Sequence, residues 1–192
     1  MRLLIMGPPG AGKGTQAAMI CEEFGIQHVS TGDLFRLNLT QGTALGQEAK
    51  KYMDAGEYVP DSVTNGMVRE RLKDSDTASG FLLDGYPRTV AQVAELDGML
   101  SSKPLDRVIE LTADTDVVVK RLLGRAIEQG RADDTEEVIR HRQAVYLEQT
   151  APLIEIYSAR GIVIEIDGLG QVGEVTDRIL NSLTALGFSP AN

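Results

Sequence analysis

Residues that commonly build disulfides or zinc sites are scarce in this sequence. Of its 192 residues, one is a cysteine, Cys21, and two are histidines, His28 and His141. One cysteine cannot form an internal disulfide, and with two distant histidines it cannot complete a tetrahedral zinc site. Cys21 lies at helical spacing with Ala17 and Ile20, which favours buried packing over a reactive thiol. We therefore expect no zinc and no metal ion ligated mainly by side chains.

The sequence also lacks a long apolar run and an excess of positive charge. No apolar run approaches the roughly 18 to 20 residues that cross a membrane, and the apolar start at residues 1–6 is too short for a signal-peptide core. The net charge of −9 argues against general nucleic-acid binding, which needs a basic face. We expect a cytoplasmic protein with neither nucleic-acid nor membrane partners.

Short apolar runs alternate with amphipathic stretches along the chain. Strands are predicted at 2–6, 26–29, 81–83, 107–111 and 162–166. Helices are predicted at 13–24, 31–39, 44–55, 61–73 with Asp61 as its N-cap, 89–100, 114–126, 135–159 and 172–186. This alternation predicts βαβ units and a parallel sheet covered by helices on both faces. Residues 30–59 and the polar loop at 126–134 do not fit the pattern, so we expect them to be mobile covers over a site.

A glycine-rich segment joins the first predicted strand to the first predicted helix. It is Gly7-Pro8-Pro9-Gly10-Ala11-Gly12-Lys13-Gly14-Thr15. Backbone N–H groups of such a loop can point at phosphate oxygens, and the helix N-terminus adds positive potential. Lys13 supplies a charge for the outer phosphates. The context predicts a phosphate-binding loop. Since Gly14 replaces the usual Ser or Thr, either Thr15 takes part of the metal-binding role or phosphates and water hold the metal.

A second chemical signal follows the third predicted strand. Asp84 ends this strand at the sheet edge where α/β proteins bind ligands, and its carboxylate can orient Mg²⁺ through the water shell of the ion. Gly85 permits close approach of a ligand, and Arg88 follows the turn at Pro87. Arginines number 13 and lysines 6, and arginine binds phosphate through a planar fork. Five arginines lie in or beside the covers and this turn: Arg36, Arg88, Arg125, Arg131 and Arg142.

With the glycine-rich loop, three further motifs resemble those of the adenylate kinases, in the same order and spacing over essentially the whole chain. They are Ser30–Arg36, Asp84–Thr89 and Gly130–Asp134. The resemblance implies a P-loop NTPase-type three-layer αβα fold with a five-stranded parallel sheet. It implies one domain with a core of 1–29, 60–123 and 135–192, an AMP-binding segment at 30–59 and a short lid at 124–134. The implied reaction is reversible, Mg²⁺-dependent phosphoryl transfer from ATP to AMP, which gives two ADP.

The resemblance also implies a role for individual residues. Catalysis is expected from Lys13, Asp84, Arg88, Arg131 and Arg142. ATP is expected to contact Gly10, Ala11, Gly12, Lys13, Gly14, Thr15, Arg121, Arg125 and, through its backbone, Gly170. AMP is expected to contact Thr31, Arg36, Met53, Glu57, Tyr58, Val59, Gly85, Tyr86, Pro87, Arg88, Gln92, Arg131 and Arg142. The Mg²⁺ that accompanies ATP is expected to be held mainly by phosphates and water and oriented by Asp84.

Two alternatives remain at this point. A UMP/CMP kinase would share the same core, but commonly has Ala-Gly where this chain has Thr31-Gly32, and tends to carry Asn near Thr89 and Gln92. The Gln92 amide fits the edge of adenine or cytosine, and a rotated amide would fit uracil. A non-catalytic nucleotide sensor would be expected to lack Lys13, Asp84 or the lid arginine. We expect a monomer that acts on ATP, AMP and ADP.

Overall fold

The computed structural model describes residues 1–129 and 135–191, with the backbone alone for residues 125–129. In these residues one sheet has the strand order β2-β3-β1-β4-β5. The strands are β1 (Arg2–Met6), β2 (Gln27–Ser30), β3 (Phe81–Asp84), β4 (Arg107–Thr112) and β5 (Val163–Asp167). All neighbouring strands are parallel, so their carboxyl ends meet at one edge. The predicted αβα fold with a five-stranded parallel sheet is confirmed.

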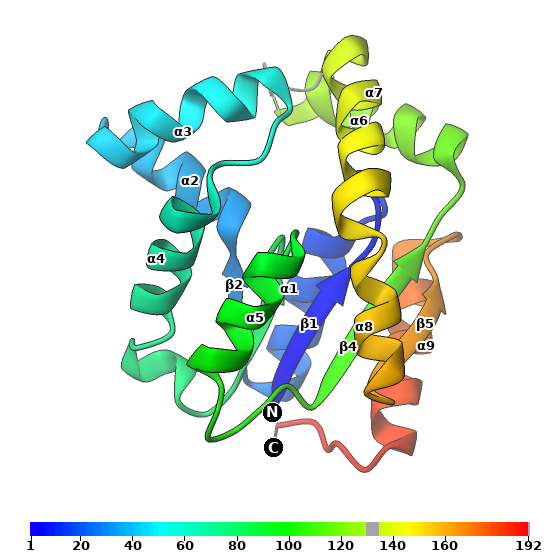
Figure 1. The fold of residues 1–192 in the computed structure, drawn as a ribbon. Helices are drawn as coiled ribbons and strands as arrows, with labels where there is room; N and C mark the ends of the chain where they lie inside the picture. Colours follow the sequence, from blue (N-terminus) through cyan, green and yellow to red (C-terminus); the bar gives the residue numbers. More distant parts are fainter. Residues whose placement is uncertain (130–134, 192) are drawn as a thin grey trace.

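Helices cover both faces of the sheet. They are α1 (Lys13–Phe24), α2 (Thr31–Thr40), α3 (Ala44–Ala55), α4 (Asp61–Arg71), α5 (Val90–Met99), α6 (Thr115–Gln129), α7 (Glu136–Val145), α8 (Leu153–Ala159) and α9 (Val172–Ala185), with a 3₁₀ turn at Ser75–Thr77 and a π turn at Tyr146–Thr150. Figure 1 shows α2 and α3 together on one side of the carboxyl edge of the sheet, and α6 with α7 on the other. These two groups of helices flank the place where the strands end.

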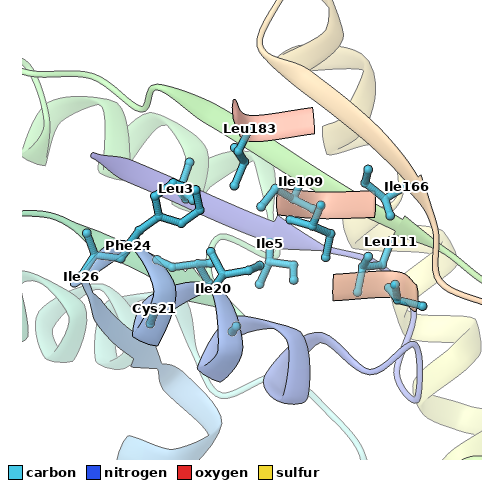
Figure 2. Packing of buried hydrophobic residues seen from close by; sticks show 14 of the residues in the cluster. Leu3, Ile5, Ile20, Cys21, Phe24, Ile26, Ile109, Leu111, Ile166 and Leu183 are labelled. Atoms are coloured by element: carbon cyan, nitrogen blue, oxygen red, sulfur yellow. The ribbon is translucent and has the colours of Figure 1, made fainter. Parts of the chain in front are cut away.

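The side chains of β1 alternate between two cores. Leu3 and Ile5 pack with α1 and α9 on one face, as Figure 2 shows. Leu4 and Met6 pack with α4, α5 and α8 on the other face. All four are at most 3% exposed, as expected for a central strand covered on both sides. A third cluster, centred on Phe35, packs α2 against α3.

The prediction of one helix over 135–159 was wrong. The chain forms α7, then a π turn in which the Ala151 N–H donates to the Tyr146 carbonyl at 2.9 Å, and then α8. Pro152 explains the interruption, because proline has no N–H to donate and its ring clashes with the carbonyl four residues earlier. A wider turn accommodates the proline and moves this carbonyl away.

The predicted N-cap at Asp61 was also wrong. Pro60 occupies the cap position, and Asp61 is the first residue of α4. The carboxylate of Asp61 instead accepts hydrogen bonds from the Thr89 hydroxyl at 2.9 Å and the Gln92 amide at 2.7 Å. Asp61 thus joins α4 to the start of α5.

The packing role predicted for Cys21 is confirmed. Its side chain lies in the core between α1 and the sheet and is 7% exposed. Burial, and then the negative charge of Asp84, raises the pKa of the Cys21 thiol to about 12. Because the thiolate is the reactive form, this thiol has little nucleophilic character at neutral pH.

Gly80 provides a test of the packing at the start of β3. Its φ is +147°, and a Cβ atom here would lie 2.3 Å from the backbone oxygen of Met1. We expect Gly80→Ala to lower the free energy of unfolding by at least about 2 kcal/mol, because both the strained φ and the clash are imposed on the folded state. Urea unfolding followed by circular dichroism measures this change.

Gly98→Ala is the matched control. Gly98 lies in α5 and is exposed, and a Cβ atom added there would meet no neighbouring atom within 4 Å. We expect this change to raise the free energy of unfolding by up to about 1 kcal/mol, because alanine favours the helix. Equal effects of the two changes would contradict the close approach at Gly80.

Candidate active site

A cavity of about 830 Å³ opens at the carboxyl edge of the sheet. Its walls come from the glycine-rich loop, the ends of β2 and β3, the segment after α3, and parts of α6, α7 and the π turn. Open α/β sheets bind ligands at this edge. The volume falls within the range typical of small-molecule sites.

The cavity brings nearly all of the predicted site residues together. Those that line it are Gly10, Ala11, Gly12, Lys13, Gly14, Thr15, Thr31, Arg36, Met53, Glu57, Tyr58, Val59, Asp84, Gly85, Tyr86, Pro87, Arg88, Gln92, Arg121, Arg142 and Gly170. Arg131 lies outside the described residues, and only the backbone of Arg125 is described. The cavity therefore collects side chains from segments far apart in the sequence.

The glycine-rich loop turns sharply between β1 and α1. Gly7, directly after β1, has a φ of +144°, and a Cβ atom there would lie 2.4 Å from the backbone oxygen of Leu111. Gly12 is the N-cap of α1 and provides no side-chain cap. The ammonium of Lys13 donates to the carbonyls of Gly7 at 2.7 Å and Pro8 at 3.0 Å. The loop thus presents a helix N-terminus and a lysine to the cavity, an arrangement suited to an anion.

Asp84 is a carboxylate at the end of β3 that lines the cavity. Its side chain is 13% exposed, and its Oδ2 lies 3.4 Å from His28 Nε2 on the neighbouring strand β2. Burial alone would raise the pKa of the Asp84 carboxyl. The contact with His28 and the charges of Lys13, His28 and Arg88 outweigh burial and hold this pKa below its ordinary value. Asp84 is therefore a carboxylate at neutral pH.

Arg88 is restrained on several sides. Its Nε donates to the Gly85 carbonyl at 2.7 Å, and its guanidinium lies over the ring of Tyr58, 4.9 Å from the centroid. The hydroxyl of Thr150, in the π turn, donates to the Arg88 carbonyl at 2.9 Å and contacts the Tyr58 hydroxyl at 2.7 Å. An arginine held in this way is oriented before a ligand binds.

Helices α2 and α7, which lie on different sides of the carboxyl edge of the sheet, also contribute charged side chains to the cavity. The Thr31 hydroxyl donates to the Gly85 carbonyl at 2.9 Å, which ties the start of α2 to the turn after β3. Arg36, one turn later, pairs with Asp33. Arg142 of α7 donates to the Met53 carbonyl at 3.4 Å. Segments from both sides of the cavity therefore meet around the Arg88 turn and the end of α3.

The comparisons with known proteins agree with this geometry. The family model described as "Adenylate kinase" matches residues 5–162. The chain is 65% identical over 188 residues to the adenylate kinase of Nocardioides sp., which covers 97% of this chain and 98% of the relative. It is 62% identical over 184 residues to that of Kocuria rhizophila, with 95% and 98% covered. The chain belongs to the adenylate kinase family. The resemblance inferred from the motifs is confirmed, and the chain is a nucleoside monophosphate kinase, a phosphotransferase.

Several cavity residues of this adenylate kinase family member were missed by the sequence analysis. His28 was considered as an isolated histidine, and only the adjacency of β2 and β3 places it beside Asp84. Tyr146 and Thr150 line the cavity because the π turn brings them there. The periodicity of the sequence does not indicate this turn, but Pro152 inside the predicted helix is a signal for an interruption close to these two residues.

The loop after β5 is held by an arginine that the sequence analysis did not consider. Arg178 of α9 donates to the carbonyls of Asp167 at 2.7 Å and Leu169 at 2.6 Å. Arg121 of α6 donates to the Gly168 carbonyl at 3.2 Å. Together they fix the backbone that leads to Gly170, the residue expected beside the adenine of ATP.

Neither a metal cluster nor a membrane-spanning helix occurs in the described part of the chain. Within 1–129 and 135–191, no group of three or more His, Cys, Asp or Glu side chains could hold a metal ion. In the same ranges, no helix combines the length and apolar character required to cross a bilayer.

The depressed pKa of Asp84 predicts a pH-dependent contribution to stability. Because the pKa in the folded state lies below the ordinary 3.8, the charged carboxylate stabilises the fold above that pH, and this contribution is lost as the pH falls through the folded-state pKa. We expect the difference in unfolding free energy between the wild type and Asp84→Asn to be constant between about pH 5 and 6 and to shrink below about pH 4. Urea unfolding at each pH measures it. A difference that stays constant down to about pH 3 would contradict the assignment.

Proposed function

We propose that the chain catalyses reversible, Mg²⁺-dependent phosphoryl transfer from ATP to AMP, which gives two ADP. The observation that carries this proposal is the shared cavity. The glycine-rich loop with Lys13, the Arg88 turn, Arg142 and Asp84 all line it, and the charges of Lys13 and Arg88 both act on the Asp84 carboxylate. Membership of the adenylate kinase family supports the same reaction.

The glycine-rich loop and the loop after β5 form the proposed ATP side. The backbone from Gly10 to Thr15 surrounds the outer phosphates, and Lys13 moves from the carbonyls of Gly7 and Pro8 to the phosphate oxygens. Arg121, with Arg125, neutralises phosphate charge. The adenine lies beside Gly170, where the backbone is held by Arg178 and Arg121.

The proposed AMP side lies between α2, the end of α3 and the Arg88 turn. Arg36, Arg88 and Arg142 bind the phosphate, and the base lies near Met53, Val59 and Gln92. Phe35, Ala49 and Val59 form a separate small core in this segment, which supports the proposal that residues 30–59 form a cover distinct from the rest of the domain.

Phosphoryl transfer needs little covalent chemistry from the protein. It needs in-line alignment of the two phosphates, neutralisation of their charge and exclusion of water. Lys13, Arg88 and Arg142 supply charge from both sides of the cavity. We propose that Arg131, in the lid at 124–134, adds a further positive charge on the transferring group when the lid closes.

The site fits a magnesium ion carried by ATP. The buried Asp84 carboxylate faces the glycine-rich loop, and a Cβ atom on Gly14 would lie 3.5 Å from Asp84 Oδ2. A carboxylate at this place can bind the water shell of Mg²⁺, which usually keeps several waters. The ion would neutralise charge on the phosphates, while Asp84 orients it. Thr15 is a further candidate for contact with its water shell.

An assay of ADP formation tests the proposal. With ATP, Mg²⁺ and one acceptor in turn, we expect turnover with AMP and far less with CMP, UMP or GMP. Preference for CMP or UMP would make the chain a UMP/CMP kinase. Nucleotide binding without turnover would make it a sensor. We further propose a cytoplasmic monomer, which sedimentation of the purified protein tests for its oligomeric state.

Lys13→Ala tests the ATP side. We expect kcat to fall by at least about 10²-fold, because a charge that stabilises the transferring phosphates is lost. The melting temperature should stay close to that of the wild type. Lys73→Ala, which removes an exposed lysine paired with Glu70 outside the cavity, is the control and should leave both quantities unchanged. Near-normal turnover of Lys13→Ala would refute the role of the loop.

A further inference from the structure

The side-chain amide of Gln92 is buried at the edge of the cavity, and both its oxygen and its nitrogen are hydrogen-bonded to the protein. Gln92 lies in the first turn of α5 and is 1% exposed. Its Oε1 accepts from the backbone N–H of Arg88 at 2.7 Å, and its Nε2 donates to Asp61 Oδ1 at 2.7 Å. The side chain also lines the cavity.

The two partners allow only one orientation of this amide. A backbone N–H can only donate, and a carboxylate at neutral pH can only accept. Rotating the amide by half a turn would place N–H against N–H at Arg88, and oxygen against carboxylate at Asp61. Both hydrogen bonds would be lost at once. Each loss costs free energy, because it leaves a buried polar group without a partner and away from water.

Asp61 is itself held in place. Its second oxygen, Oδ2, accepts from the Thr89 hydroxyl at 2.9 Å. The same hydroxyl accepts from the backbone N–H of Gln92 at 3.2 Å. Asp61, Thr89 and Gln92 therefore form a closed set of hydrogen bonds between the first turns of α4 and α5 that does not depend on a bound nucleotide.

One acceptor and one donor position of the amide remain for a ligand. An amide oxygen can accept two hydrogen bonds and an amide nitrogen can donate two, and the protein uses one of each. The adenine edge offers an amino donor beside a ring-nitrogen acceptor, and the cytosine edge does the same. Hypoxanthine, guanine and uracil offer the reverse, a carbonyl acceptor beside a ring N–H donor. An amide that cannot rotate can match only one of these two classes.

We propose that Asp61 determines base specificity by fixing the Gln92 amide in the orientation that matches amino bases and rejects oxo bases. The proposal rests on the proposed function, in which AMP is the phosphoryl acceptor and its base lies at Gln92. Asp61 is a positioning residue, because it acts on the base through Gln92. The rotated amide considered from the sequence, which would have accepted uracil, is disfavoured by these contacts.

The wild-type protein provides the first test. AMP and IMP have the same ring system and nearly the same size, but their base edges are opposite in donor and acceptor pattern. We expect kcat/KM for AMP to exceed that for IMP by at least about 10²-fold, because IMP leaves both amide groups mismatched. A ratio below about tenfold would overturn the proposal while the proposed function stands. Absence of turnover with AMP would refute the proposed function itself.

The variant Asp61→Asn provides the second test. It keeps the size of the side chain, but an asparagine can either accept from the Gln92 nitrogen or donate to the Gln92 oxygen, so half of the orientational constraint is removed. We expect the AMP/IMP ratio of kcat/KM to fall at least about fivefold, with little change in melting temperature. Asp97→Asn is the control, because Asp97 pairs with Arg160 on the surface, and its ratio should equal that of the wild type.

A merely structural role for Asp61 gives a different result. Loss of packing or of a helix-terminal charge would lower kcat/KM for AMP and IMP in parallel and leave their ratio unchanged. That outcome would overturn the proposal. The ratio is therefore the deciding quantity, whatever the loss of absolute activity in the variant.

Discussion

The parallel pairing of β1 with β3 is the constraint on which the site depends. Ile5 lies opposite Asp84 in this register, so the glycine-rich loop begins beside the carboxylate and the Arg88 turn begins beside the loop. These segments are separated by almost 80 positions in the sequence. A shift of one residue in the register would also turn the side chains of β1 to the opposite faces of the sheet. Each set would then meet the helices that now pack against the other set. The packing of β1 on both faces therefore fixes the register and the geometry of the site together.

The positions of the strands, and with them the class of fold, could be predicted well from the sequence. The strands are short, and all except β2 are at least half apolar. Each predicted strand lies within two residues of the observed one. The resemblance to a family added the placement of residues around a common site. All predicted site residues with described side chains line one cavity, although their roles in binding and catalysis remain proposals.

The failures have specific physical causes. Helical periodicity does not distinguish an α-helix from a helix with a π turn, and Pro152 marks an interruption without indicating the type of turn at Tyr146–Thr150. The preference of aspartate for N-caps was overridden at Asp61 because its carboxylate accepts hydrogen bonds from Thr89 and Gln92 at the start of α5. The contact between His28 and Asp84 depends on strand order, which periodicity does not encode. In each case the missing information concerned a partner distant in the sequence or a backbone detail.

The π turn has a consequence for how changes in this protein combine. The Thr150 hydroxyl has a single proton, and it is donated to the Arg88 carbonyl; the Tyr58 hydroxyl must therefore be the donor in its contact with Thr150. Tyr58 after α3, Thr150 in the π turn and Arg88 after β3 thus share one directional chain of hydrogen bonds. Groups in one network are coupled energetically, so the three positions form a single thermodynamic unit. The effect of a substitution at any one of these positions therefore depends on which residues occupy the other two.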